Sequence, residues 1–430
     1  MTRRARRAVL AAAAATAAAF ACGPGASAVV AGAAAAATAR PRALPTPAAP
    51  GSGEPRLVAT PDGGVLMSWL ETRRRGGHAL RFARLAGRRW AAPRTVAEGD
   101  SFFVNWADVP GVRPFGRGGL AAWWLWMTDL DRRSYGVRMS LSRDGGATWS
   151  APFTLHADLA GAEHGFVSVA PEGDGVRAVW LDGHRLTGAD GPDRGVEVAM
   201  TLHARALRDD GAAGPEEELD ARVCDCCQTA AVALDDGTVL VAYRDRGPGE
   251  VRDMSLVRLE AGRWSEPVPL HADGWVTGAC PVNGPFLDAS GRRVVAAWYT
   301  EGGGEAEVRV ALSEDGGRTF GPYVTVARGE TLGRVGAALL ADGSAVVTWL
   351  EGTGAEARVR ARRMAAAASA GAAPAAGEPV TIARTSGMRA SGFPQVVRRG
   401  DELIFAWTEV GKPSRVRLAT LPAAELPPAR

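Results

Sequence analysis

The chain has 430 residues, of which 46% are hydrophobic and 23% are charged, and this composition excludes an intrinsically disordered protein. It carries 50 basic and 47 acidic side chains, but four of the arginines lie at positions 3, 4, 6 and 7, so the rest of the chain is close to neutral. This balance excludes the strongly basic surface of a nucleic-acid-binding protein and the polybasic patch of a membrane-surface protein.

The N-terminal segment has the pattern of an export signal. Basic residues 1–7 precede an alanine-rich apolar run that ends at residue 21, which is too short and too weakly apolar for a permanent membrane span. Cys22 lies between Ala21 and Gly23, an arrangement similar to the lipidation site of bacterial lipoproteins. We therefore expect a signal peptide over 1–21 and export to the periplasm or the outer cell surface. We expect a lipid on Cys22 to be the contact with the membrane, and cleavage after Ala21 or Ala28 without lipidation is the alternative.

Residues 22–53 are rich in Ala, Pro and Gly and predict a flexible tether. From residue 54 a phrase recurs seven times, made of a glycine turn, a β-branched run, an aromatic residue and an acidic residue. The aromatic residues lie 51–63 positions apart, at Trp69, Trp124, Trp180, Tyr243, Trp298, Trp349 and Trp407. This period is typical of β-propeller blades.

We therefore predict an all-β fold, a single β-propeller over residues 54–430 with seven four-stranded blades. Six blades with one irregular unit are the alternative. In the fourth unit we expect strands at 229–234, 239–244, 251–259 and 266–270, with apolar and polar residues alternating. The repeated aromatic residues are expected to pack between blades rather than to bind sugars. The low-complexity run 365–377 is expected to be a loop inserted in the sixth unit.

Two segments carry the Asp-box motif S-x-D-x-G-x-x-[W/F]. In this turn the aspartate accepts backbone N–H bonds, the glycine permits positive φ, and the aromatic ring covers the edge of a blade. The motif residues are Ser142, Asp144, Gly146 and Trp149 in the second unit, and Ser313, Asp315, Gly317 and Phe320 in the fifth. With these motifs the chain resembles the sialidase-like (BNR/Asp-box) propeller superfamily. Residues 224–229 (CDCCQT) and 280–285 (CPVNGP) are also similar to segments of bacterial envelope proteins labelled sialidase-like.

The resemblance implies an exo-α-sialidase-like glycoside hydrolase. Sialidases hold the sialate carboxylate with three arginines, and Arg56 in the phrase Glu54-Pro55-Arg56-Leu57 is the counterpart of the first, without the Ile-Pro that follows it in the family. They also use a tyrosine nucleophile late in the ring. The four tyrosines of this chain are Tyr135, Tyr243, Tyr299 and Tyr323, and none of them lies in the last two units. The catalytic pattern is incomplete, so the sequence leaves open whether the chain is an enzyme.

In a propeller, the starts of the innermost strands and the ends of the second strands share one face, so their residues meet at a central funnel. The ends of the second strands supply carboxylates to this funnel, and repeated structural ion pairs are the alternative role for these carboxylates. Glu163 and His164 precede the third innermost strand. We expect an anionic, glycan-type ligand to be bound there by Arg56, Arg244, Arg246 and Asn283. Tyr243 and Asp245 are the residues expected nearest the reaction.

Four cysteines remain if Cys22 carries a lipid, namely Cys224, Cys226, Cys227 and Cys280. In an exported protein they favour disulfides, with Cys280 bridging to the 224–227 segment across two blades. The other two then pair as Cys224–Cys226 or Cys224–Cys227. A copper(I) or zinc site, joined by His164, and a redox-active pair are the alternatives. We expect no other metal or cofactor.

The sequence thus predicts an exported, monomeric propeller that binds an anionic glycan, and the family resemblance implies that it hydrolyses this glycan. The first alternative is a non-catalytic binding or assembly module of the envelope. The second is a metal-handling envelope protein that uses the cysteine cluster.

Overall fold

A computed structural model describes residues 39–429 apart from 130–133, 158–160, 187–198, 354 and 367–374. The expected signal peptide and Cys22 lie outside the described residues. Within this part of the chain, every regular element is a β-strand or a single turn of 3-10 helix. No helix among these residues is long and apolar enough to cross a membrane.

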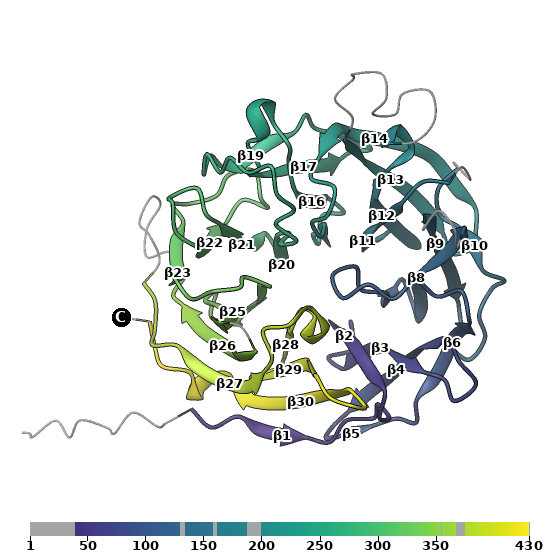
Figure 1. The fold of residues 1–430 in the computed structure, drawn as a ribbon, viewed down its shortest axis with the longest axis horizontal. Helices are drawn as coiled ribbons and strands as arrows, with labels where there is room; N and C mark the ends of the chain where they lie inside the picture. Colours follow the sequence, from purple (N-terminus) through teal and green to yellow (C-terminus); the bar gives the residue numbers. More distant parts are fainter. Residues whose placement is uncertain are drawn as a thin grey trace, which may run out of the picture. The chain divides into compact units, whose positions relative to one another are not determined.

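The strands form seven antiparallel sheets arranged as the blades of a ring (Figure 1). Blades 1 to 3 consist of β2 (Ser52–Ala59), β3 (Val65–Thr72), β4 (His78–Ala86), β5 (Arg89–Trp90) and β6 (Arg94–Gly99); β7 (Gly111–Phe115), β8 (Gly119–Asp129), β9 (Ser134–Ser142) and β10 (Phe153–Thr154); and β11 (His164–Glu172), β12 (Gly175–Asp182), β13 (Met200–Arg208) and β14 (Ala213–Val223).

Blades 4 to 6 follow the same pattern. They consist of β15 (Ala230–Ala233), β16 (Val239–Arg244), β17 (Met254–Glu260), β18 (Arg263–Trp264) and β19 (Val268–His271); β20 (Phe286–Ser290), β21 (Arg293–Thr300), β22 (Glu307–Ser313) and β23 (Val324–Arg328); and β24 (Gly336–Leu339), β25 (Ala345–Thr353), β26 (Glu356–Met364) and β27 (Val380–Thr385). The 3-10 turns are η1 (His184–Leu186), η4 (Pro248–Glu250), η5 (Arg389–Ser391) and η6 (Ala423–Glu425).

The seventh blade joins the two ends of the described chain. It consists of β28 (Gln395–Arg399), β29 (Glu402–Glu409), β30 (Arg415–Pro422) and, as its outermost strand, β1 (Arg42–Leu44). β1 pairs antiparallel with β30, and Arg42 Nη2 donates to Glu425 Oε1 over 2.6 Å. The segment expected to be a tether therefore contributes a strand, because the last blade lacks a fourth strand of its own. The prediction of seven blades is confirmed.

The innermost strands close the ring. Each of β2, β7, β11, β15, β20, β24 and β28 contacts the innermost strand of the next blade, and β28 contacts β2. The second strands are buried along their length, as in β12 and β16, instead of alternating as expected. Each lies inside a sheet that is covered on both faces by neighbouring blades, so both of its faces meet apolar side chains.

The repeated tryptophans pack between blades as expected. Trp69, Trp180, Trp298 and Trp349 are almost fully buried. The Nε1 atoms of Trp69 and Trp180 donate to the carboxylates two residues further on, Glu71 (2.8 Å) and Asp182 (3.0 Å). Buried tryptophans need such an acceptor, and this explains part of the repeated aromatic–acidic phrase.

Both Asp-boxes form the expected turn between the third and fourth strands of their blades. In the first, Gly146 N donates to Ser142 Oγ (2.8 Å) and Thr148 N donates to Asp144 Oδ1 (2.9 Å), while Gly146 has a φ of 82°. Trp149 packs edge-on against Phe82 of the preceding blade. The second box, from Ser313 to Phe320, has the same bonds, from Gly317 N to Ser313 Oγ and from Thr319 N to Asp315 Oδ1.

Candidate functional site

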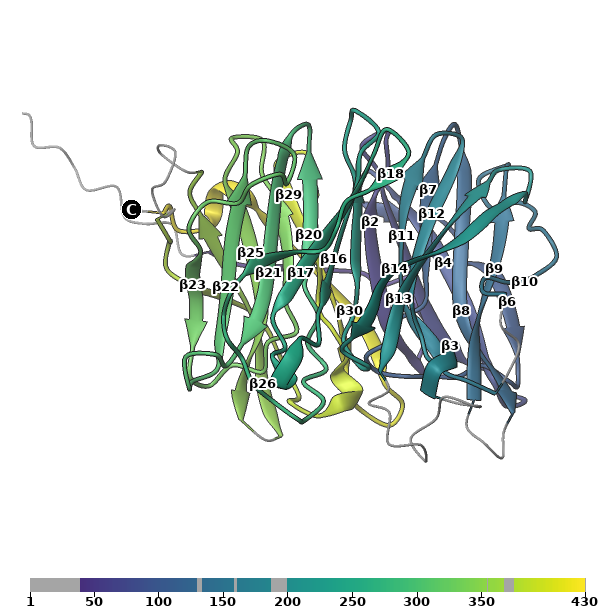
Figure 2. The same cartoon turned by 90° about the horizontal axis from the view of Figure 1, so that it is seen from above.

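The loops that precede the innermost strands open on one face of the ring, which we call the A-start face. Because successive strands of a blade run in opposite directions, the turns that follow the second strands open there too, and the Asp-box turns lie on the opposite face. Figure 2 shows the strands running between these two faces. The residues expected at the funnel therefore share one face.

A cavity of about 380 Å³ lies inside the ring of innermost strands. Its charged lining residues are Arg56, Arg113, Asp288 and Arg398. Burial lowers the pKa of Arg56 to about 10, and the nearby charge of Arg113 acts in the same direction. Burial raises the pKa of Asp288. Charged groups in this cavity are therefore poorly solvated, and arginines outnumber acids among them.

Two buried carboxyl groups, Glu54 and Asp108, lie on the A-start side of this cavity. Glu54 belongs to β2, and its Oε2 has no hydrogen-bond partner among the described residues. Asp108 lies before β7, and its Oδ2 accepts a bond from Phe166 N over 2.6 Å. Burial raises the pKa of Asp108 to about 7; it also raises the pKa of Glu54, with a further contribution from Asp108. Both carboxyl groups therefore keep a proton to higher pH than a solvent-exposed acid does.

Arg56 is a cation whose charge acts on Asp108. Its Nη2 donates to Val109 O (3.2 Å), its guanidinium lies 5.1 Å from the centre of the Trp123 ring, and its Nε has no hydrogen-bond partner among the described residues. The charge of Arg56 lowers the pKa of Asp108. The guanidinium therefore keeps donor capacity that the neighbouring protein groups leave unfilled.

Tyr135, on β9 of blade 2, and Glu163, just before β11 of blade 3, complete the group. The Tyr135 hydroxyl is hydrogen-bonded to the carboxylate of Glu163, and burial together with the charges of Asp108 and Glu163 raises the pKa of Tyr135 far above its usual value. A Cβ added to Gly165 would collide with Asp108 Oδ2 and lie 3.2 Å from Tyr135 Cε2. Asp108 and Tyr135 therefore meet over Gly165. We call Glu54, Arg56, Asp108, Tyr135 and Glu163 the mouth cluster.

The predicted site residues 243–246 lie at the end of β16 and just after it in blade 4, on the A-start face. Arg244 is buried and donates to three backbone carbonyls: Asn283 O (2.8 and 3.0 Å), Tyr299 O (2.7 Å) and Arg252 O (2.5 Å). Its side chain also lies 4.7 Å from the centre of the Trp275 ring. These contacts make Arg244 a link between blades 4 and 5.

Tyr243 and Asp245 are two further acidic groups whose pKa values are raised. The Tyr243 hydroxyl donates to Asp220 Oδ2 over 2.5 Å, and burial raises the pKa of Tyr243 far above its usual value. Burial and the charge of Asp220 raise the pKa of Asp245 to about 6. Arg246 pairs with Glu250 (3.0 Å) and with Asp225 (3.4 Å).

Asp225 connects this network to the mouth cluster, because its charge raises the pKa of Glu163. Asn283, the remaining predicted ligand residue, accepts a bond from Arg334 N (2.7 Å) and donates to Leu332 O (3.3 Å). Its amide therefore joins the segment before β20 to the segment before β24. The predicted roles of Tyr243, Arg244, Asp245, Arg246 and Asn283 in binding or catalysis stay predictions.

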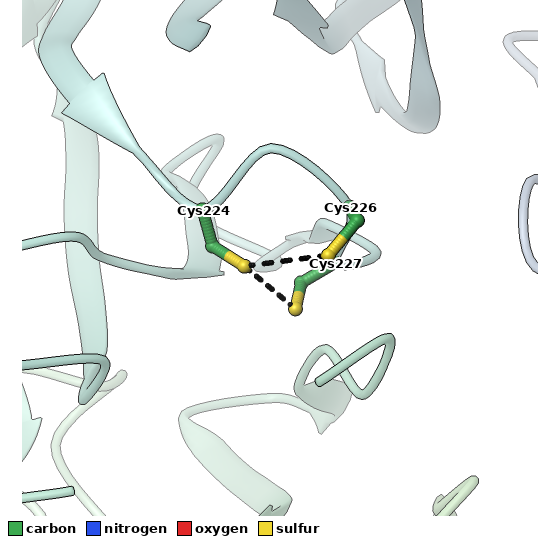
Figure 3. A group of neighbouring side chains, drawn as sticks. All are labelled: Cys224, Cys226 and Cys227. Atoms are coloured by element: carbon green, nitrogen blue, oxygen red, sulfur yellow. Dashed lines mark hydrogen bonds between the residues drawn. The ribbon is translucent and has the colours of Figure 1, made fainter. Parts of the chain in front are cut away.

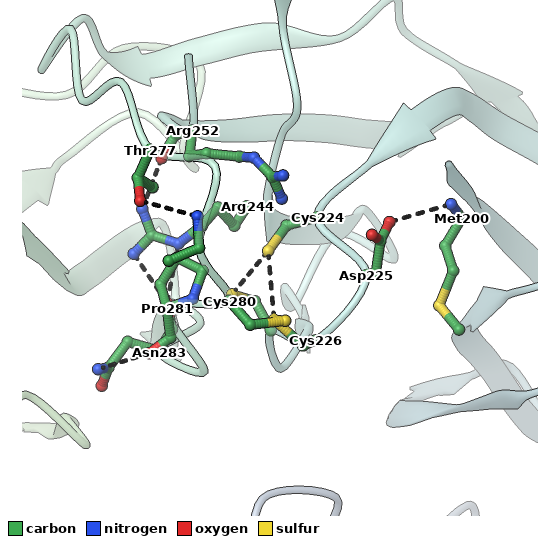
Figure 4. Close-up of a disulfide and its surroundings, with 12 residues drawn as sticks. Met200, Cys224, Asp225, Cys226, Arg244, Arg252, Thr277, Cys280, Pro281 and Asn283 are labelled. Atoms are coloured by element: carbon green, nitrogen blue, oxygen red, sulfur yellow. Dashed lines mark hydrogen bonds between the residues drawn. A yellow bond between two sulfur atoms is a disulfide. The ribbon is translucent and has the colours of Figure 1, made fainter. Parts of the chain in front are cut away.

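The cysteine segment lies where blades 4 and 5 meet. Cys226 and Cys280 form a disulfide, so the predicted bridge across the two blades is confirmed (Figure 4). Cys224 and Cys227 are buried thiols, and Figure 3 shows their side chains pointing toward one another. Their Sγ atoms are 2.9 Å apart, and the Cys224 and Cys226 Sγ atoms are 3.9 Å apart.

A histidine group on blade 3 was not predicted. Asp182 Oδ1 lies 2.6 Å from His184 Nδ1, and His203 Nδ1 lies 2.9 Å from Glu216 Oε1. Asp182, His184 and His203 bring their possible ligand atoms within 4.8 Å of one another, as do Cys224, Cys226 and Cys227. Among the described residues these two groups are the places where side chains of metal-ligating type converge. His164, the histidine expected to join the cysteines, pairs instead with Asp182 (3.3 Å).

The sequence analysis missed Asp108 and Tyr135 and gave Glu54 no role of its own. A usable signal exists for Asp108, because it precedes β7 just as Glu163 precedes β11 and Asp225 precedes β15. A carboxylate before three consecutive innermost strands indicates a shared acidic mouth. Tyr135 has no such signal, since only the fold brings β9 beside the start of β11.

No family model matches the chain, and no curated protein matches it. Solved structures do resemble it. A protein of unknown function from Dyadobacter fermentans is 15% identical, with a TM-score of 0.51 over 89% of this chain and 97% of that one. This likeness shows a shared fold.

Two further solved structures fall below that level of similarity. An α-L-arabinanase from Penicillium chrysogenum, complexed with arabinobiose, is 12% identical with a TM-score of 0.47 over 90% of this chain and 99% of that one. A Hadza microbial sialidase is 13% identical with a TM-score of 0.46 over 81% of this chain and 74% of that one.

Proposed function

We propose that the chain binds a carbohydrate bearing an anionic group at the mouth cluster and cleaves its glycosidic bond by general acid–base chemistry. The observation that carries this proposal is the burial of Asp108 within range of the Arg56 charge, and this burial raises the pKa of Asp108 to about 7. A carboxyl group with this pKa can donate a proton to a leaving oxygen at neutral pH, whereas an ordinary surface aspartate is already ionised.

The other members of the mouth cluster have complementary roles. Glycoside hydrolysis uses a second carboxyl group as base or nucleophile, and Glu163 is exposed and joined to Tyr135. Arg56 lines the cavity and has an unpartnered Nε, so it is the candidate for the anionic group of the ligand. An exo-acting, sialidase-like specificity is the finer form of this proposal.

Tyr243 and Asp245 are the second candidate pair for the chemistry. Asp245 has a pKa of about 6, which also lies near neutrality. The hydroxyl of its neighbour Tyr243 donates to Asp220. If Tyr243 and Asp245 carry the chemistry, their variants are inactive; if the mouth cluster carries it, the Asp108 variant is inactive instead.

The test is turnover of fluorogenic 4-methylumbelliferyl glycosides, comparing a sialoside and a glucuronide with a neutral arabinofuranoside. We expect Asp108→Asn to lower kcat at least 100-fold. Arg56→Gln should raise KM for the acidic substrates about tenfold and leave the neutral one unchanged. Tyr243→Phe and Asp245→Asn are the comparison variants and should stay within twofold of wild type.

The reverse pattern, with the blade-four variants inactive and Asp108→Asn active, would place the chemistry on blade 4. If no glycoside is turned over while acidic glycans bind in a manner that Arg56→Gln abolishes, the chain is the non-catalytic binding module. Indifference of both activity and binding to all four variants would eliminate both sites.

We also propose that the protein is exported and held at the membrane by a lipid on Cys22. The sequence pattern of residues 1–23 supports this proposal. Membrane fractionation and labelling with a radioactive fatty acid should lose the signal in Cys22→Ala. Unchanged attachment of this variant would remove the lipid anchor.

A further inference from the structure

Four sulfur atoms from two neighbouring blades gather beside the A-start face. Cys224 and Cys227 are each 1% exposed, whereas Cys280 lies on an exposed part of the segment before β20. Cys226 is bonded to Cys280, and its Sγ is 3.9 Å from Cys224 Sγ. A buried dithiol is therefore in sulfur–sulfur contact with a disulfide whose other end reaches the surface (Figure 4).

The surroundings distinguish the two thiols. Cys224 Sγ is hydrogen-bonded to Cys227 Sγ over 2.9 Å and lies near the positive charges of Arg244 and Arg252; its pKa is lowered to about 7, chiefly by the hydrogen bond with Cys227. Burial raises the pKa of Cys227 well above its usual value. The contact and the charges both make Cys224 the thiolate, and a thiolate is the species that attacks a disulfide.

We propose that the four cysteines form an internal thiol–disulfide relay, which moves a disulfide between the surface pair Cys226–Cys280 and the buried pair Cys224–Cys227. In the first step the Cys224 thiolate attacks Cys226 Sγ, a Cys224–Cys226 bond forms, and Cys280 leaves as a thiolate. In the second step Cys227 gives its proton to the Cys280 thiolate and attacks Cys224 Sγ, so that Cys226 leaves. Each step forms one S–S bond and breaks one, and no external oxidant or reductant is consumed.

The relay gives the protein an activity that is separate from the mouth cluster. After transfer, Cys226 and Cys280 are a dithiol with Cys280 exposed at the surface. Such a dithiol reduces a disulfide in another protein by ordinary exchange: the partner disulfide becomes two thiols and Cys226–Cys280 forms again. The substrate class is therefore a protein disulfide that can reach the loop before β20.

The test uses the exported chain in its two-thiol state, obtained directly or by adding one equivalent of dithiothreitol. Acid quenching, alkylation with N-ethylmaleimide and peptide mapping then identify which cysteines are paired. We expect both isomers, Cys226–Cys280 and Cys224–Cys227, in a ratio that does not change with the glutathione redox ratio, because the isomers contain the same number of electrons.

Native alkylation without reductant gives the second readout. We expect iodoacetamide to label Cys280 in wild type, and Cys224→Ser to reduce this labelling at least tenfold, because the first step is lost. Cys227→Ser should stop the relay at Cys224–Cys226 and leave Cys280 labelled. Arg252→Gln, which keeps all four cysteines, should slow the labelling of Cys280, and its thermal unfolding serves as the folding control.

Three results would overturn the relay. The first is a two-thiol state that contains only one disulfide isomer. The second is Cys280 labelling that is equal in wild type and Cys224→Ser. The third is four free thiols with stoichiometric copper or zinc, which would establish the metal site instead.

Discussion

Asp108→Asn removes a buried acid whose ionisation opposes folding. The folded protein holds the Asp108 pKa at about 7, against an ordinary value of 3.8. Between these two pH values the folded chain keeps a proton that the unfolded chain loses, so the free energy of unfolding falls as pH rises. The full change is about 4 kcal/mol, because each pH unit of separation corresponds to about 1.4 kcal/mol. Below pH 4 and above pH 7 this contribution is constant.

The assay is urea unfolding followed by tryptophan fluorescence at pH values from 4 to 8. The difference in unfolding free energy between Asp108→Asn and wild type should shift by about 4 kcal/mol in favour of the variant across this range. Asp401→Asn, which changes an exposed aspartate, is the matched control and should follow wild type. Parallel pH profiles for Asp108→Asn and wild type would refute the burial argument, and with it the physical basis of the proton donor.

Three further predictions test the surrounding structure. Gly165→Ala should lower both Tm and glycoside turnover, because its Cβ would collide with the Asp108 carboxylate. The control Gly278→Ala should change neither, because no atom lies within 4 Å of its added Cβ, and equal effects of the two variants would disprove the contact. Cys280→Ser should lower the unfolding free energy by about 4 kcal/mol in urea titrations, since the disulfide closes a loop with a sequence separation of 54, and an unchanged urea midpoint would contradict this. Arg244→Met leaves three buried carbonyl groups without their donor and should cost about 3 kcal/mol or more in the same titration, so a stability equal to wild type would mean that these bonds contribute nothing.

The sequence predicted the ring because its repeated phrase has a local cause. A buried second strand that carries a large aromatic residue recurs from blade to blade, and in two blades the tryptophan Nε1 donates to a carboxylate two residues later, at Trp69–Glu71 and Trp180–Asp182. The disulfide between Cys226 and Cys280 followed from the adjacency of blades 4 and 5. Both predictions need only the order of the blades.

The rest depends on contacts that blade order does not determine. The binding role of Arg244 stays a prediction, but the sequence did not show that carbonyls from three separate segments of backbone accept its hydrogen bonds, because no pattern in the side chains reports where carbonyls point. Glu54 and Asp108 are ordinary acids in the sequence, and their pKa values rise only because the assembled blades bury Glu54 of β2 and Asp108 before β7. Burial of this kind is a property of the assembled ring.

The pairing of β1 with β30 also governs when the ring can form. Residues 42–44 have their sheet partner at residues 418–420, almost at the other end of the chain. Contacts between such distant segments form slowly, because a very long stretch of chain must first be ordered. During synthesis from the N-terminus, β1 must therefore wait, unpaired, for β30, and until then its free edge is open to pairing with other chains.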